Sequence, residues 1–322
     1  MNRRNFLLGG SAAAAGLTIG VPARAQSAPI KVVTGFAPGG SADSLARLVA
    51  ELLQAQSGRP TIVENRTGAA GRLAVDQVKR AAADGDTLLL APHGPMTLFP
   101  YVFKSLSYVP AKDFTPITRV ASGDYALTIG PMVPAKDFAG LRQWLRTAGD
   151  RANYGSPGAG TVPHFLGVAV ARQMGVPMTH VPYRGSTLTL ADVAGGQLAM
   201  AVSPLTEALP LHKSGKVRVL ATFGSALSPF VEGVPTLKES GADIDVSTWF
   251  AVYGPAGMPA AVTERLRNTI AAGLNAPAAK ERLAVLALAP APSTTQELIE
   301  LQTSESRMWA PLVKASGFTP DD

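Results

Sequence analysis

The fold can be inferred outward from one stretch, Asn153-Tyr154-Gly155-Ser156-Pro157-Gly158-Ala159-Gly160-Thr161. It lies between a short strand-like run and a run of apolar residues at helical spacing. Its three glycines and its proline are typical of a tight turn whose backbone is little covered by side chains. The first N–H groups of a helix have no acceptor within the helix, and the helix dipole favours negative charge there. The stretch therefore predicts a strand-to-helix turn suited to an anion.

Three further strand-to-helix turns are rich in Gly, Ser or Thr: Pro38-Gly39-Gly40-Ser41, Gly68-Ala69-Ala70-Gly71 and Arg184-Gly185-Ser186-Thr187. Any one of them alone is better explained as a tight turn, because glycine is the default turn residue. Four together favour an anion site at the strand ends, where α/β sheets bind ligands. Arg184 suits a carboxylate bidentately or is a solvated surface arginine, and the sequence leaves both open.

Hydrophobic periodicity predicts alternating strands and helices, and this order implies parallel sheets covered by helices. In the first half we expect Ser41 to be the N-cap of a helix that follows the strand Ile30 to Phe36. The other expected strands are 61–63, 87–91, 125–129, 152–155, 178–183, 198–202, 217–223 and 246–253. The other expected helices are 68–83, 138–148, 162–174, 187–193, 263–274, 278–287 and 295–314.

The helical C-terminal segment is expected to pack back on the first unit, with Ser293 and Gln296 as a capping box for its last helix. This implies two crossings between units, near Val120 and Val246. We therefore predict an α/β fold with one lobe formed by residues 26–120 and 247–322, and a second lobe formed by residues 121–246.

Composition limits the class of protein. The chain has 322 residues, of which 46% are hydrophobic and 16% charged, and it has no cysteine. These values indicate a packed globular protein without disulfides or thiolate sites. The formal charge of +6 includes Arg3, Arg4 and Arg24 of a predicted export signal that has no acidic residue. Without that segment the charge is only weakly positive, so we expect no nucleic-acid partner.

Residues 1–25 resemble an export signal. Arg3 and Arg4 precede an apolar run to Val21, and Ala23-Arg24-Ala25 is a small-x-small cleavage site. The paired arginines suggest a twin-arginine signal, and a general secretory signal is the alternative. A transmembrane helix is disfavoured because the run is short and rich in Gly and Ala. We expect a periplasmic protein, cleaved after about Ala25.

Other chemistries find little support in the sequence. No turn fits a phosphate-binding glycine motif, so no cofactor is expected. A hydrolase with Ser156 as nucleophile is a remaining alternative, although Tyr154 stands where a nucleophile elbow has glycine and His164 is not marked as a base. The four histidines, His93, His164, His180 and His212, do not have the spacing of a zinc site, so no metal is expected.

At several motifs the sequence resembles the Bug-type periplasmic receptors of tripartite tricarboxylate transporters, and the resemblance covers nearly the whole chain after the signal. The motifs that carry it are Phe36-Ala37-Pro38-Gly39-Gly40-Ser41-Ala42-Asp43, Val63 to Gly71, Asp84 to Leu89, Lys112 to Ile117, Tyr154 to Thr161 with His164, His180 to Gly185, Asp192-Val193 with Gly195-Gly196-Gln197, and Gly254 to Pro259. The chain departs from the family pattern at Thr67, Val168, Leu188 and Ala199. The resemblance therefore does not specify the part of the ligand other than its carboxylate.

The resemblance implies a two-lobed periplasmic-binding-protein fold of type II (Venus flytrap), closing on a ligand between the lobes. It implies a monomeric, non-enzymatic receptor that delivers a small organic mono- or dicarboxylate to a membrane permease, or a sensor that uses the same pocket. Loop backbone groups would hold the carboxylate. The implied ligand-binding residues are Phe36, Gly39, Gly40, Ser41, Pro92 and His93 of the first lobe, and Ser156, Gly160, Thr161, Arg184 and Ser203 of the second.

Overall fold

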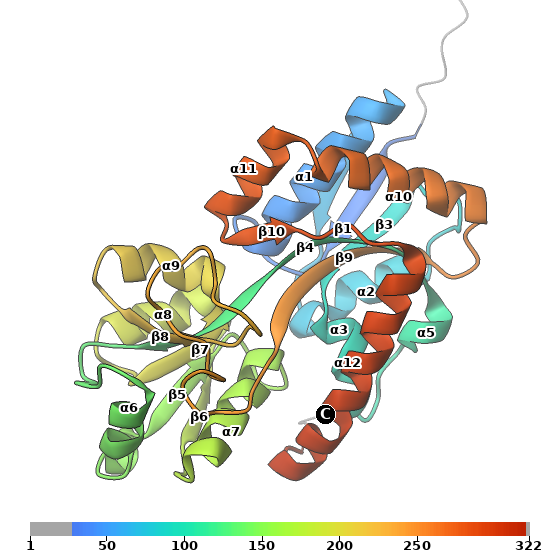
Figure 1. The fold of residues 1–322 in the computed structure, drawn as a ribbon. Helices are drawn as coiled ribbons and strands as arrows, with labels where there is room; N and C mark the ends of the chain where they lie inside the picture. Colours follow the sequence, from blue (N-terminus) through green and yellow to red (C-terminus); the bar gives the residue numbers. More distant parts are fainter. Residues whose placement is uncertain (1–27, 320–322) are drawn as a thin grey trace, which may run out of the picture.

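The computed structural model describes Ala28 to Thr319, and the predicted export signal lies outside this range. The described chain forms two lobes, each with a sheet covered by helices (Figure 1). Among the helices of this range, none has the length and apolar character needed to cross a bilayer.

The first lobe is built on three parallel strands, β1 (Ile30–Thr34), β2 (Thr61–Asn65) and β3 (Thr87–Pro92). The connections between them are α1 (Ser41–Ser57) and the pair η1 (Ala69–Gly71) and α2 (Arg72–Lys79). The predicted β-α-β-α-β order and its parallel sheet are thus confirmed. The sheet continues in the order β2-β1-β3-β9-β4.

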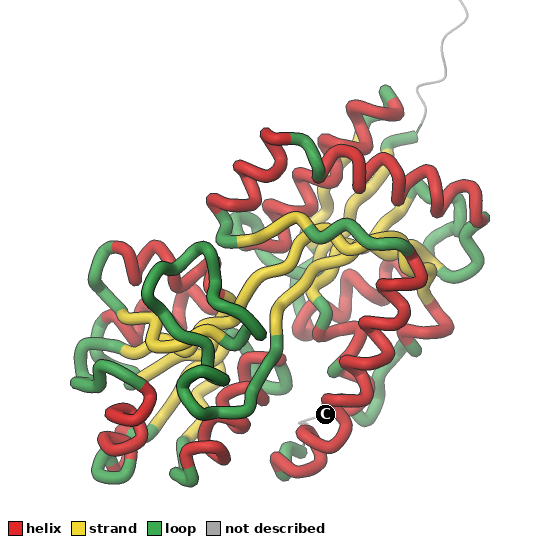
Figure 2. The backbone as a smooth tube through the Cα atoms, viewed as in Figure 1, coloured by secondary structure: helices red, strands yellow, loops and turns green. Residues whose placement is uncertain are grey.

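The two lobes are joined by a strand that belongs to both sheets. β4 (Phe114–Ile129) pairs with β9 (Ser247–Pro255) from Phe114 to Asp124, and with β7 from Tyr125 onward (Figure 2). The sequence predicted only the second part, because proline, glycine and aspartate in the first part are poor strand formers. The pairing with β9 shifts register twice, between Pro116 and Thr118 and between Arg119 and Ala121.

The second lobe repeats the parallel pattern with β5 (Asn153–Ser156), β6 (Thr179–Pro182) and β7 (Met200–Pro204). β8 (Arg218–Thr222) pairs antiparallel with β4. The helices are α6 (Phe138–Leu145), η2 (Gly149–Arg151), α7 (Val162–Met174), α8 (Ser186–Ala194) and α9 (Leu205–Lys213). The sequence did not predict α9, a short helix with a proline at position 210 in its interior.

The C-terminal helices α10 (Ala260–Leu274), α11 (Pro277–Val285) and α12 (Thr295–Ser316) return to the first lobe, and β10 (Leu288–Pro290) pairs with β4. α12 also reaches the second lobe, because Trp309 and Val313 lie in a buried cluster with residues of α7 and β7. The short helices α3 (Gly94–Thr97), α4 (Phe99–Val102) and α5 (Pro110–Asp113) complete the described chain.

Two predicted helix caps are wrong. The N-cap of α1 is Gly40, and Ser41 is its first helical residue. The capping box of α12 is formed by Thr294 and Glu297, one residue beyond the predicted pair. Ser293 is instead tied to β4, because its N–H donates to the Thr118 hydroxyl and its own hydroxyl accepts from the Arg119 N–H.

The lobe boundaries after residues 120 and 246 remain a proposal, and the strand pairing supports it. β4 changes partner between Asp124 and Tyr125, and β9 begins at Ser247. One buried cluster lies wholly in the first lobe, around Val33, Leu89 and Trp249.

Candidate functional site at the seam between the lobes

The glycine-rich turns of each lobe follow strands that end at a common sheet edge. In the first lobe Thr34 of β1 lies beside Asn65 of β2 and Leu90 of β3. In the second lobe Ser156 of β5 lies beside Pro182 of β6, while β7 runs on the other side of β5. The carboxyl ends of these parallel strands therefore lead into the turns from which a ligand edge is built.

The lobes touch at what we call the seam, defined by the contacts Ser41–Glu207, Thr206–Leu286 and Val102–Gly160. The Ser41 hydroxyl donates to Oε1 of Glu207 over 3.4 Å. The Thr206 hydroxyl donates to the Leu286 carbonyl over 2.6 Å. The first turn of α9 is therefore bonded to the first lobe at two successive residues.

The turn before α1 leaves backbone donors at the seam. The first helical hydrogen bond runs from the Ser44 N–H to the Gly40 carbonyl, so the N–H groups of Ser41 and Ala42 have no acceptor within the helix. The Gly39 N–H, which the sequence assigned to the ligand, donates to Oδ2 of Asp43 over 3.0 Å. Phe36 is half-buried at the start of this turn.

Glu207, in the first turn of α9, brings a buried carboxyl group to the seam. The residue keeps some exposed surface, but its Oε2 has none and accepts no hydrogen bond from the described residues. Burial raises the pKa of Glu207, and the hydroxyl groups of Ser186 and Ser41 lower it. The effect of burial is larger, so the pKa of Glu207 is about 7. Glu207 was not among the predicted site residues, because α9 itself was not predicted.

The turn before α8 supplies the other hydroxyl near this carboxyl. Gly185 is the N-cap, with a φ of 124° that favours glycine, and Ser186 is buried as the first helical residue. The first helical hydrogen bond runs from Thr189 to Gly185, which leaves the N–H groups of Ser186 and Thr187 without an acceptor in the helix. Arg184 is exposed.

The turn before α7, from which the fold was inferred, contacts the first lobe at another point. Gly160 has a φ of 71°, and a Cβ on it would lie 2.8 Å from Cγ1 of Val102 in α4. The Gly160 N–H donates to Nδ1 of His164 over 3.1 Å, and the Thr161 hydroxyl donates to the Gly158 carbonyl over 2.7 Å. These polar groups of the turn are thus paired inside the protein.

Ser156 is fully buried and lies 2.8 Å from Nε2 of His180. Its hydroxyl donates to the Gly158 carbonyl over 2.9 Å, so Nε2 is left to act as a donor toward Oγ. Burial and the charge of the neighbouring His164 lower the pKa of His180 to about 3. A histidine that holds protons so weakly is a poor general base near neutral pH. The geometry therefore does not favour Ser156 as a nucleophile.

His164 and His180 stack on each other, with ring centroids 3.9 Å apart and planes 16° apart. Burial lowers the pKa of His164 to about 4. Both rings are therefore neutral at physiological pH. His164 is a packed residue that orients the turn through Gly160.

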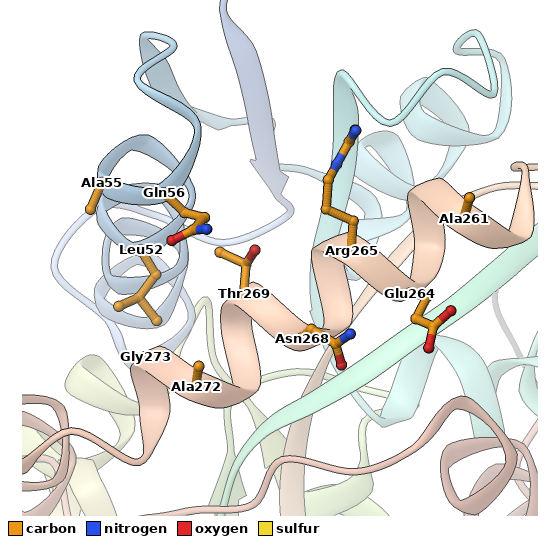
Figure 3. Close-up of a pocket in the computed structure, with 10 residues that line it drawn as sticks. All are labelled: Leu52, Ala55, Gln56, Ala261, Glu264, Arg265, Asn268, Thr269, Ala272 and Gly273. Atoms are coloured by element: carbon orange, nitrogen blue, oxygen red, sulfur yellow. The ribbon is translucent and has the colours of Figure 1, made fainter.

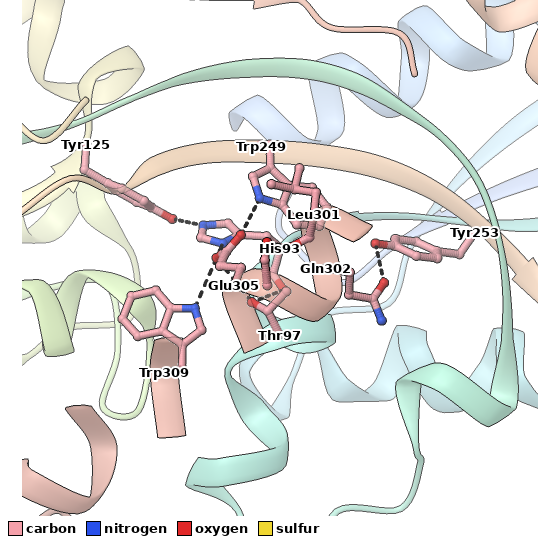
Figure 4. Close-up of polar contacts among 10 residues, drawn as sticks. His93, Thr97, Tyr125, Trp249, Tyr253, Leu301, Gln302, Glu305 and Trp309 are labelled. Carbon is pink, nitrogen blue, oxygen red and sulfur yellow. Dashed lines mark hydrogen bonds and ion pairs between the residues drawn. The ribbon is translucent and has the colours of Figure 1, made fainter. Parts of the chain in front are cut away.

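His93 belongs to a buried polar cluster around Glu305 of α12 (Figure 4). The Glu305 carboxylate accepts from Nδ1 of His93, from Trp309 over 3.1 Å and from Trp249 over 2.6 Å. Nε2 of His93 is 2.7 Å from the Tyr125 hydroxyl. Burial raises the pKa of Glu305, but the charge and hydrogen bonds of His93 and the tryptophans outweigh it, so this pKa lies below its usual value.

The Glu305 cluster ties together elements of both lobes, because Tyr125 lies on β4, Trp249 on β9 and His93 directly after β3. The N–H of His93 donates to the Trp249 carbonyl over 3.0 Å, so it is not free for a ligand. Pro92, the last residue of β3, is half-buried. No motif of the sequence indicates this cluster, because its members are far apart along the chain.

The predicted site residues thus fall into separate groups. Ser41, Gly40 and the turn of Arg184 lie near Glu207. Ser156, Gly160 and Thr161 lie in or next to the turn before α7, where Gly160 faces Val102 of α4. His93 lies in the Glu305 cluster. Ser203, at the end of β7, is fully buried, and its hydroxyl donates to the Pro204 carbonyl over 3.4 Å. Between Ala28 and Thr319 no group of three or more acidic or histidine side chains is placed to hold a metal ion.

A groove of about 680 Å³ lies away from these turns (Figure 3). It runs between α1 and α10, and its lining includes Leu52, Gln56, Arg265 and Thr269. These helices do not contribute strand-to-helix turns at this point, so the groove is separate from the candidate site.

Residues 45–318 match the family model described as the tripartite tricarboxylate transporter family receptor. The chain belongs to this family. Among curated relatives of this receptor, the protein BugT of Bordetella pertussis is 29% identical over 320 residues, covering 98% of each chain. A relative from Cupriavidus necator is 29% identical over 326 residues and covers 99% of each chain.

Solved structures support the same assignment. A Rhodopseudomonas palustris protein solved with adipate has a TM-score of 0.85 and 28% identity, covering 91% of this receptor and 98% of that chain. MatC from Rhodopseudomonas palustris with bound malate has a TM-score of 0.81 and 29% identity, with coverages of 88% and 98%. The periplasmic binding protein BugD has a TM-score of 0.82 and 28% identity, with coverages of 91% and 99%. The receptor therefore has the two-lobed periplasmic-binding-protein fold that its sequence predicted.

Proposed function

We propose that this protein is a periplasmic receptor that captures a small organic carboxylate between its lobes and delivers it to a permease of the tripartite tricarboxylate type. The observation that carries this proposal is the convergence of two helix starts on one carboxyl group. Ser41 begins α1 and Ser186 begins α8, and their hydroxyl groups both act on the carboxyl group of Glu207. This carboxyl group marks the part of the seam where the two helix starts, with their N–H donors, come together.

The backbone supplies the donors for the ligand. The N–H groups of Ser41, Ala42, Ser186 and Thr187 have no acceptor within their helices. A hydrogen bond to a charged group contributes roughly 1.5–3 kcal/mol net. Four such bonds, less the cost of desolvation and ordering, are enough for the ~8 kcal/mol of micromolar binding. Neither a metal nor a cofactor is needed for this affinity.

The relatives support the ligand class and the location. Two similar structures were solved with adipate and malate, both small organic acids, and a third is a periplasmic binding protein. On this basis we infer that the chain is exported and binds a compound of the same general class. The family to which the chain belongs supports delivery to a permease.

Thermal unfolding of the mature protein against a panel of organic acids tests this function. A ligand at 100 times its Kd stabilises the folded state by about 2.7 kcal/mol, so the unfolding temperature is expected to rise measurably with at least one acid. Mass spectrometry of the ligand that co-purifies with the protein would identify it. If no acid at millimolar concentration shifts the unfolding temperature, the proposed function is wrong. Co-purification with a signalling protein in place of a permease would favour the sensor alternative.

A further inference from the structure

The carboxyl group of Glu207 is incompletely paired. Its Oε1 accepts a long hydrogen bond of 3.4 Å from Ser41. Its Oε2 has no accessible surface and accepts no hydrogen bond from the described residues; the Ser186 hydroxyl is near enough to lower the Glu207 pKa but does not reach the carboxyl group at hydrogen-bond geometry. A buried acceptor without a donor destabilises the folded state, and a donor group on a ligand would remove that cost.

Glu207 also lacks a positive partner. No salt bridge of the described residues involves it, and Arg47, the basic residue in the first half of α1, pairs with Asp43 over 3.0 Å. A ligand carboxylate placed beside an ionised Glu207 would meet a like charge in a buried environment, which is strongly unfavourable. The surroundings of Glu207 thus favour a hydrogen-bond donor and disfavour an anion.

The ligand carboxylate is held by the N–H groups at the helix starts, where donors and dipole charge offset its repulsion by the nearby Glu207. The first-turn N–H groups of α1 and α8 are donors, and each helix dipole places partial positive charge there. A ligand bound by these groups through one carboxylate would bring its remaining polar groups toward Glu207. The side chain would then discriminate among ligands by what they carry beyond that carboxylate.

We propose that Glu207 is a specificity-determining residue that accepts a hydrogen bond from the ligand, so that the receptor selects monocarboxylates with a hydroxyl, amide or ammonium group and rejects dicarboxylates. This inference rests on the proposed function and narrows it. Adipate and malate, the ligands of two similar structures, both carry two carboxylates, so within the small organic acids the ligand of this receptor is expected to differ from theirs by carrying one.

Two matched series of acids test the inference by calorimetric titration of the mature protein at pH 8, where the Glu207 carboxyl is ionised. One series is propionate, lactate and succinate, and the other is hexanoate, 6-hydroxyhexanoate and adipate. The wild type is expected to bind the hydroxy acid of at least one series about tenfold or more tighter than its diacid. Glu207→Gln removes the charge and keeps the shape, so it is expected to reduce this ratio about tenfold.

Glu264→Gln on the exposed face of α10 is the matched control and is expected to leave the ratio unchanged. A wild type that binds succinate or adipate as tightly as the matching hydroxy acid overturns the inference, as does an unchanged ratio in Glu207→Gln. The wild-type ratios decide the question even if the variant does not fold. Absence of binding by every acid, in contrast, overturns the proposed function itself.

Discussion

Glu207, Asp43 and Glu305 are buried acidic side chains with different surroundings. Asp43 accepts hydrogen bonds from Arg47, Asn65 and the Gly39 N–H. Glu305 accepts from His93 and two tryptophans. The pKa values of Asp43 and Glu305 lie below their usual values, although burial alone would raise them. Only hydroxyl groups offset burial at Glu207, so its pKa moves in the opposite direction.

The raised pKa of Glu207 predicts a pH-dependent effect of Glu207→Gln on stability. The pKa rises from 4.5 in the unfolded chain to about 7 in the folded protein. The folded state therefore holds a proton that the unfolded state has lost, and stability falls as the pH rises through this window, by about 1.4 kcal/mol per unit. The glutamine variant does not pay this cost. The free energy of unfolding of the variant minus that of the wild type should therefore be about 2 kcal/mol larger at pH 8 than at pH 5.

Urea unfolding at both pH values measures this difference, and Glu264→Gln serves as the exposed control. An identical difference between variant and wild type at pH 5 and pH 8 would show that Glu207 titrates as an ordinary solvated carboxyl group. The prediction does not depend on any ligand, so it tests the burial of the side chain separately from its role in specificity.

Removing the Glu305 carboxylate should destabilise the protein strongly. Glu305→Ala leaves the donors of His93, Trp249 and Trp309 buried without an acceptor, which is expected to cost about 3–5 kcal/mol. Glu300→Ala, an exposed position on the same helix, should cost less than about 0.5 kcal/mol. Denaturant unfolding followed by tryptophan fluorescence measures both. Equal losses in the two variants would contradict a structural role for the Glu305 cluster.

At the scale of the element, the sequence predicted those segments whose local signals agree. α7 was predicted at Val162–Met174 and observed there, because Pro163 suits the first turn and Gly175 adopts the left-handed C-cap conformation. α9 and the first part of β4 were missed, since a proline in a helix and a proline and glycine in a strand argue against the structure that tertiary packing imposes.

The glycine-rich turns were located correctly along the chain, but the state of their N–H groups was not predictable. Gly39 and Gly160 were expected to offer donors to a ligand, yet Asp43 and His164 accept from them. Each acceptor is four residues further along the chain, and this spacing is the local signal that these N–H groups are paired within the turn. The donors without an acceptor in their helices belong instead to the residues after the N-caps.

The capping box of α12 predicts a local loss of stability. The Thr294 hydroxyl accepts from the Glu297 N–H over 3.1 Å, and the Glu297 side chain accepts from the Thr294 N–H over 2.8 Å. Thr294→Ala removes the first of these and should cost about 1 kcal/mol. Thr303→Ala in the middle of the same helix is the control, and thermal unfolding is the measurement. A loss no greater than that of the control would contradict the assignment of the cap.

Gly160 and Gly196 form a natural matched pair, because both have a φ of 71°. A Cβ at Gly196 meets nothing within 4 Å, whereas one at Gly160 would lie 2.8 Å from Val102 of the other lobe. Gly196→Ala should therefore cost only the backbone strain of about 1 kcal/mol. Gly160→Ala should cost more and should weaken ligand binding, because it pushes the lobes apart at the seam. Calorimetric titration and thermal unfolding of both variants test this, and equal behaviour would contradict the contact.

At the scale of the whole molecule, the candidate site depends on contacts between distant segments. Ser41 and Glu207 are separated by 166 residues, and His93 and Glu305 by 212. Neither contact has a local sequence signal, so the seam and the Glu305 cluster could not be inferred before the structure. The two-lobed arrangement could be, because the repeated α/β order and the return of the C-terminal helices are visible in the pattern of apolar residues.

The passage of β4 through both sheets has a consequence for engineering. A chimaera that combines the ligand specificity of one family member with the permease recognition of another would have to be joined inside a hydrogen-bonded ladder. The natural first splice point is between Asp124 and Tyr125, where β4 changes its pairing partner from β9 to β7. The second splice point, where the chain returns to the first lobe, is the start of β9 at Ser247. Grafts cut in the surface loops on either side of β4 would instead keep the whole strand with one parent, so that half of it would pair with strands of the other parent.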